Sequence, residues 1–212
     1  MPERKVVLAS ASPRRQRLLR RLGLQFSVEA AAIDEQAIRG GSPEELVARI
    51  ALAKAEAVHR PGQVTVAADT TVALDDEILG KPRSAEEATT MLKRLRGRWH
   101  RVLTALAVVD DRGAHVDVVT TEVLMRPYSD EEIAAYVASG DPFDKAGAYA
   151  VQNRQFHPVE RIRGCYENVV GLPLCQLQRR LKAAGVAVPG LPPDICRQEM
   201  GQECEVAQAL EA

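Results

Sequence analysis

Aromatic residues, metal-binding motifs and uninterrupted apolar runs are scarce in this sequence. Only 4% of the residues are Phe, Trp or Tyr, and the formal net charge is -1. Proteins that bind nucleic acid usually carry a basic surface, so that class is disfavoured. Charged residues interrupt every apolar run, which argues against a membrane-spanning helix and a secretory signal. We therefore expect a cytoplasmic enzyme or binding protein without nucleic-acid or membrane partners.

Cysteine and serine motifs are missing as well. None of the 4 cysteines is spaced as C-x-x-C, and the 4 histidines share no metal-ligand spacing on one element. A zinc or redox site is therefore disfavoured, and reduced thiols are expected. Cys196 and Cys204 fall in a polar tail, where their thiols can be exposed. A serine hydrolase is disfavoured because no G-x-S-x-G motif is present.

What is present is an ordinary globular composition, with 46% hydrophobic and 27% charged residues in 212 positions. This length allows one large lobe or two small ones. Strand patterns predict strands at 6–9, 25–28, 64–68, 101–109, 114–124 and 159–162, and a hairpin at 72–79. Helices are predicted after three Ser-x-x-Glu capping boxes that begin at Ser42, Ser84 and Ser129. Two more helices are expected, one after Ser12 and one around Leu174 to Leu181, so the chain is of the α/β class.

The first helix of the chain begins in an unusual way. Ser12 is a good N-cap and Pro13 suits the first helical position, but Arg14 and Arg15 follow at once. Basic residues oppose the helix dipole in the first turn unless an anion compensates them. These residues therefore indicate a phosphate site at the helix N-terminus. A solvated basic face is the alternative, because further arginines continue the helix.

Four other places carry candidate site residues. Asp69 follows the predicted strand 64–68, at its carboxyl end, where it can act as a metal ligand, a general base or a cap. Lys81, between a glycine and a proline, can reach a phosphate. Asp34 and Glu35 form a solvated loop or face a phosphate through a cation. The polar loop 141–152 is suited to binding.

Six motifs follow one another along the chain: Ser10-Ala11-Ser12-Pro13-Arg14-Arg15, Asp34-Glu35, Ala68-Asp69-Thr70, Gly80-Lys81-Pro82, Asp144-Lys145-Ala146-Gly147-Ala148-Tyr149 and Asn168-Val169-Val170-Gly171-Leu172-Pro173. In this order they resemble the Maf family of nucleoside triphosphate pyrophosphatases. The resemblance covers about residues 5–185. It implies a fold of the Maf and inosine-triphosphatase type, with a long twisted mixed sheet and helices in two lobes around a central cleft. We expect one catalytic domain over residues 1–188 and an appendage over 189–212.

The resemblance also implies a reaction: hydrolysis of dTTP and UTP to the monophosphate and pyrophosphate with Mg²⁺ or Mn²⁺. Asp69 matches the proton acceptor, and Asp69 with Glu35 is expected to hold the metal. A homodimer is a further expectation from the family. The residues expected to bind the nucleoside triphosphate are Ser10, Arg14, Arg15, Lys54, Thr70, Lys81, Lys145 and Gln152, of which Arg14, Thr70 and Gln152 match positions linked to substrate choice.

One segment departs from the family pattern and leaves alternatives open. The loop from Asn153 to Pro158 has no glycine, so Arg154, Phe156 and His157 are expected to reshape the base pocket. The same reaction on 7-methyl-GTP, a modified pyrimidine or a non-standard purine therefore stays an alternative. A different class is a nucleotide-binding regulator of septum formation, although the joint presence of Glu35, Asp69 and Lys81 favours catalysis.

Overall fold

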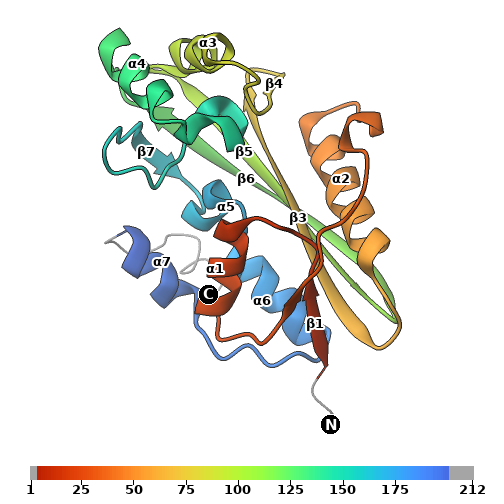
Figure 1. The fold of residues 1–212 in the computed structure, drawn as a ribbon. Coiled ribbons are helices and arrows are strands. Elements are labelled where there is room, and N and C mark those ends of the chain that lie inside the picture. The colour runs from red at the N-terminus through yellow and green to blue at the C-terminus, as the bar shows by residue number, and fades with distance from the viewer. Residues whose placement is uncertain (1–3, 201–212) are drawn as a thin grey trace.

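One mixed β-sheet organises residues 4–200, the part of the chain that the computed structural model describes (Figure 1). The strands are β1 (Lys5–Leu8), β2 (Ser27–Val28), β3 (Gln63–Leu74), β4 (Glu77–Leu79), β5 (Trp99–Asp110), β6 (Gly113–Met125) and β7 (Val159–Arg163). Their order is β2-β1-β3-β5-β6-β7, with β4 paired to β3 off this path. β1 pairs in parallel with β2 and β3, and every other pairing is antiparallel.

Helices cover both faces and one end of the sheet. They are α1 (Pro13–Arg21), α2 (Pro43–Val58), α3 (Ala85–Leu95), α4 (Asp130–Ala138), α5 (Tyr166–Val170), α6 (Leu174–Ala183) and α7 (Pro192–Met200), with short 3₁₀ turns η1 (Glu35–Ala37), η2 (Asp141–Asp144) and η3 (Ala146–Ala148). Figure 1 shows β3, β5 and β6 running between two groups, α3 with α4 at one end and α1 with α6 and β1 at the other. The predicted two-lobed α/β architecture is confirmed. Within residues 4–200, no helix is both long and apolar enough to cross a bilayer.

β3 passes through the hydrophobic cores of both lobes. Val66 packs with Leu18 of α1 in one core, and Val72 packs with Leu92 of α3 in the other. Between these two apolar ends β3 carries the half-buried polar pair Asp69 and Thr70. A polar stretch in the middle of a long central strand is unfavourable unless it lines a site.

The edge of β3 explains why this polar stretch is accessible. β5 covers one edge of β3 continuously from Thr65 to Ala73. On the other edge, pairing with β1 ends at Val66 and pairing with β4 begins at Val72. The segment 67–71 therefore has no strand beside it on that edge in the described part of the chain. This gap, beyond the carboxyl end of β1, forms the floor of a cleft.

The helix starts agree closely with the capping signals. Ser12 caps α1, and Ser42 and Ser129 form complete capping boxes. At α3 only half of the expected box forms, because Ser84 accepts from the backbone of Glu87 while the Glu87 carboxylate accepts from Arg83 N–H.

Two details of the sequence analysis are wrong. Asp69 does not end a strand, because antiparallel pairing with β5 carries β3 on to Leu74. The helical spacing of apolar residues after Ser42 predicts that Ala57 lies on the buried face of α2, but this face is centred on Val47, Ala51 and Ala55, and Ala57 is exposed.

The tail is also more closely packed than expected. Cys196 is 1% exposed, because α7 packs against the core through Ile195, so the expectation of an exposed thiol is wrong for this residue. Gly190 N–H donates to the Leu22 carbonyl at the end of α1. The domain boundary at residue 188 stays a prediction, and Cys204 lies outside the described residues.

A buried histidine makes the fold acid-sensitive. His100 of β5 contacts the Tyr149 hydroxyl at 2.7 Å through Nε2, and burial lowers its pKa from 6.5 to about 4. As the pH falls from 6.5 toward 4, the unfolded chain binds a proton that the folded chain does not, so stability decreases. At about 1.4 kcal/mol per pKa unit, the loss approaches about 3 kcal/mol.

We predict that His100→Gln flattens the dependence of the unfolding free energy on pH in this range. Urea unfolding of both proteins at several pH values between 4 and 7 measures the two slopes. Parallel curves for the two proteins would show that His100 is not the responsible group.

Candidate active site

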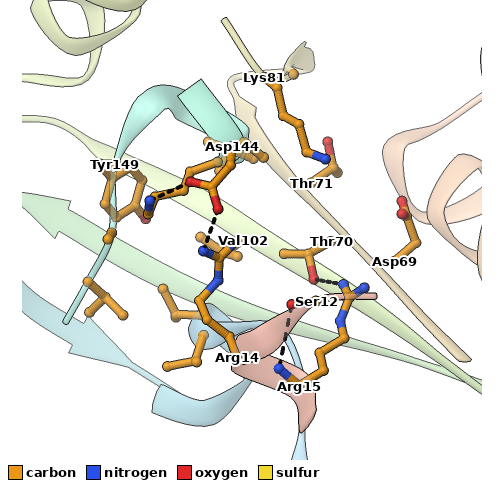
Figure 2. Close-up of a pocket in the computed structure, with 18 of the residues that line it drawn as sticks. Ser12, Arg14, Arg15, Asp69, Thr70, Thr71, Lys81, Val102, Asp144 and Tyr149 are labelled. Carbon is orange, nitrogen blue, oxygen red and sulfur yellow. Dashed lines mark hydrogen bonds and ion pairs between the residues drawn. The ribbon is translucent and has the colours of Figure 1, made fainter. Parts of the chain in front are cut away.

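The cleft has a volume of about 580 Å³ and lies over the open edge of β3. Figure 2 shows its walls: the N-terminal turn of α1 on one side, β3 in the middle, and Lys81 with Asp144 on the other side. Polar side chains predominate, and Val102, Val169 and Val170 add an apolar patch. Such a mixture suits a ligand with a charged end and a less polar end.

Arg15 is the fixed cation at the N-terminus of α1. Its Nε donates to the Gly171 carbonyl at 2.8 Å, Nη1 to Ser10 Oγ at 3.3 Å, and Nη2 to Thr70 Oγ1 at 3.0 Å. All three acceptors are neutral, and in the described part of the chain Arg15 pairs with no carboxylate. Burial lowers the pKa of Arg15, and the nearby Asp69 opposes this effect. A half-buried cation held in this way beside a helix N-terminus favours an anionic ligand.

Lys54 lies between two carboxylates. Its Nζ is 2.8 Å from Asp69 Oδ1 and 2.9 Å from Glu35 Oε1, and the Lys54 and Asp69 side chains are only 12% and 14% exposed. Burial raises the pKa of Asp69, and the charge of Lys54 opposes that shift. A carboxylate with a raised pKa in a cleft is suited to accept a proton.

Two further lysines face the cleft in different states. Lys81 forms no hydrogen bond or ion pair within residues 4–200, so its ammonium group is available to a ligand. Lys145 instead pairs with Asp141 and Asp144, and Asp144 also pairs with Arg14 at 2.8 Å. An anionic ligand that uses Arg14 or Lys145 must therefore compete with Asp144.

All of the predicted site residues except Ser10 line this cleft. Ser10 does not line the cleft, but its Oγ accepts a hydrogen bond from Arg15 Nη1. That these residues bind a substrate stays a prediction. The predicted residues that line the cleft are Arg14, Arg15, Glu35, Lys54, Asp69, Thr70, Lys81, Lys145 and Gln152.

Sequence reasoning missed three polar residues of the cleft, Gln36, Thr71 and Arg83. Each stands within two positions of a predicted residue, so the motifs that identified Glu35, Thr70 and Lys81 could have been extended to them. The expectation for Phe156 is wrong: it is 5% exposed and stacks on Tyr136 in the core. Arg154 and His157, from the same loop, do line hollows next to Gln152.

We predict that Lys54→Gln raises the pKa of Asp69 further, because it removes the main group that opposes the effect of burial. Carbon NMR of the Asp69 carboxyl group across a pH titration measures this pKa. Lys81→Gln is the matched control, since it removes a cleft lysine that has no bond to Asp69. Equal shifts in the two variants would contradict a specific Lys54–Asp69 interaction.

Known proteins share this sequence over most of its length. A family profile described as Maf-like protein matches residues 5–184. A protein of Thermomicrobium roseum named dTTP/UTP pyrophosphatase is 51% identical over 207 residues, which cover 96% of this chain and 94% of that protein. A protein of Geotalea uraniireducens with the same name is 47% identical over 184 residues, which cover 85% of this chain and 95% of that protein.

Among solved structures, the Ham1 protein of Staphylococcus aureus is 15% identical with a TM-score of 0.47, over 85% of this chain and 99% of that one. This similarity is too distant to support an argument about function. The profile match and the identity to the two named relatives are sufficient by themselves: the chain belongs to the Maf family.

Proposed function

We propose that this protein hydrolyses dTTP and UTP to the nucleoside monophosphate and pyrophosphate. The observation that carries the proposal is the Lys54–Asp69 pair, which lies opposite the fixed guanidinium of Arg15 in one cleft. A base and several cations in one site suit the hydrolysis of a phosphoanhydride. The names of the relatives support the nucleotide class.

In the proposed reaction, Asp69 accepts a proton from a water molecule. The water oxygen forms a bond to the α-phosphorus, and the bond from this phosphorus to the α–β bridging oxygen breaks. The electron pair of that bond leaves with pyrophosphate. Arg15 and Lys81 reduce the charge on the phosphate oxygens as it develops. Lys54 keeps Asp69 oriented and favours its ionised form.

The residues of the cleft fit a divalent cation. Oxygen atoms of Glu35 and Asp69 converge on one point, which the Lys54 ammonium group occupies. Mg²⁺ and Mn²⁺ are often bound by one or two carboxylates together with substrate phosphates and water. Residues 4–200 contain no cluster of three or more acidic, His or Cys side chains that could hold a metal without substrate. When bound, the cation would neutralise charge on the phosphate oxygens.

We assign the nucleobase of the substrate to the end of the cleft that contains Gln152. An amide can pair with the O4 and N3 edge of uracil or thymine, which supports pyrimidines. We also propose a cytoplasmic location, a homodimer and no nucleic-acid partner, the last supported by the net charge of -1.

We predict that Asp69→Asn lowers pyrophosphate release by a factor of about a hundred or more, because it removes the general base. The assay uses dTTP, UTP, CTP, 7-methyl-GTP and ITP, each with Mg²⁺, Mn²⁺ or a chelator. Asp76→Asn is the matched control, since this side chain is 99% exposed on the β3–β4 turn. Near-normal turnover by Asp69→Asn would contradict the mechanism.

The same panel decides the substrate. Metal-dependent release from dTTP and UTP is the expected result. Release from 7-methyl-GTP or ITP alone would retain the reaction and reject the pyrimidine preference. No turnover of any triphosphate would favour a nucleotide-binding regulator.

The pH dependence of the reaction gives an independent prediction. The pKa of Asp69 is raised above 3.8, and only the ionised carboxylate can act as a base. We expect kcat/KM to fall as the pH falls, with an apparent pKa above 3.8 that reports the free enzyme. An acid limb that is unchanged in Lys54→Gln would assign the titration to another group.

A further inference from the structure

A closed ring of hydrogen bonds connects the cleft to the interior of the sheet. It starts at Arg15 Nη2, which donates to Thr70 Oγ1 on β3 (Figure 2). Thr70 Oγ1 lies 2.9 Å from Thr104 Oγ1 on β5, and Thr104 Oγ1 donates to the Asn168 carbonyl of α5 at 2.9 Å. The ring closes where Gly171, at the end of α5, accepts from Arg15 Nε.

The direction of each bond in the ring can be assigned. A hydroxyl group has one proton, and a carbonyl oxygen can only accept. Thr104 therefore gives its proton to the Asn168 carbonyl and must accept from Thr70. The proton of Thr70 is thus directed inward, and one of its two lone pairs accepts from the Arg15 guanidinium. Thr70 can hold Arg15 in place but has no proton left to donate to a ligand.

The inner half of the ring is fully buried. Thr104, Thr121 and Asn168 are each 0% exposed. The Asn168 side-chain amide donates to the Val102 carbonyl and to Thr121 Oγ1, both at 3.0 Å. Thr121 Oγ1 in turn bonds both backbone groups of Cys165. Two buried threonines on neighbouring strands therefore hold α5 against the sheet.

We propose that Thr104 is a positioning residue of the reaction, which aims the Arg15 guanidinium into the cleft through Thr70 and through the carbonyl of Gly171. The proposal rests on the proposed function, and it assigns a role to a side chain that does not line the cleft. The packing at Gly171 agrees with it, because a Cβ added there would approach Thr70 Oγ1 to 3.3 Å and Arg15 Nη2 to 3.7 Å, so the backbone of Gly171 lies close to both groups.

The test compares Thr104→Val with Thr65→Val. Thr65 is also 0% exposed, lies on β3, and uses its hydroxyl in bonds to His59 and Gln63 away from the cleft. Each variant removes one buried hydroxyl, so thermal unfolding should show a similar loss of stability. We expect kcat/KM on dTTP to fall about tenfold or more in Thr104→Val, since a displacement of about 1 Å in a positioned group can lower rates by about a hundredfold.

Two further variants separate positioning from a structural role. Thr104→Ser restores the hydroxyl and should recover most of the activity. Thr104→Cys keeps a similar volume with a weaker donor, and replaces the valine variant if that protein does not fold. In an Arg15→Lys background, Thr104→Val should lower kcat/KM by only about twofold or less. Lysine lacks the planar guanidinium that bonds Thr70 and Gly171 together, so its position depends less on Thr104.

The affinity for inorganic triphosphate, measured by calorimetry, depends on the position of Arg15 and does not require turnover of a nucleotide. We expect Thr104→Val to weaken this binding and Thr65→Val to leave it unchanged. The proposal is overturned if Thr104→Val matches Thr65→Val in both assays, or if its effect on kcat/KM is the same with Arg15 and with lysine at that position. If the wild-type protein hydrolyses no nucleoside triphosphate, the proposed function is wrong. The calorimetric comparison of Thr104→Val with Thr65→Val then tests the positioning role by itself.

Discussion

The cleft depends on how two short strands share one edge of β3. β1 and β4 both pair with this edge, and the segment 67–71 lies between them without a strand neighbour. β5 holds the opposite edge along its whole length, so the open segment stays extended. The rigid backbone of a central strand thereby becomes the floor of a site. Groups placed on such a floor need little reorganisation when a ligand binds.

Strand geometry then divides the chemistry between two faces of the sheet. Adjacent residues of a strand point to opposite faces, so Asp69 and Thr70 reach different neighbours. Asp69 meets Lys54 of α2, and Thr70 meets Arg15 and the buried Thr104. The proposed base and the anion-binding guanidinium are therefore held by one dipeptide but by separate sets of contacts. The two groups still interact through their charges, because the pKa of each is affected by the other.

The unfavourable beginning of α1 has a structural explanation. Arginines in the first turn oppose the helix dipole, and the structure holds both in place by tertiary contacts. Arg15 is held by neutral oxygen acceptors, and Arg14 is paired with Asp144 from a distant loop. Asp144 is 62% exposed, so its attraction for Arg14 is weakened by solvent and can be replaced by a phosphate.

Local signals predicted the elements well, because caps and alternating patterns act within a few residues. The starts of α1, α2 and α4 follow from Ser12, Ser42 and Ser129 in this way. The family resemblance also identified most of the cleft residues from the sequence. The position of Asp69 within a continuous strand was missed, because its pairing with Ala105 joins segments far apart in the chain.

The same limit applies to the interior. The burial of Cys196 depends on how the tail packs against the core, which composition does not report. The hydrogen-bonded ring through Thr104 and Asn168 joins four elements, α1, β3, β5 and α5, and no local spacing indicates it. Such non-local contacts become visible only when the fold brings the residues together.

The central claim is that water attacks the α-phosphorus beside Asp69. Hydrolysis of dTTP in water labelled with ¹⁸O, followed by mass spectrometry of both products, tests it most directly. Attack at the α-phosphorus puts the label in the nucleoside monophosphate and leaves pyrophosphate unlabelled, as the account predicts. Label in the pyrophosphate would place the attack on the β-phosphorus and would contradict the proposed arrangement of base and phosphates.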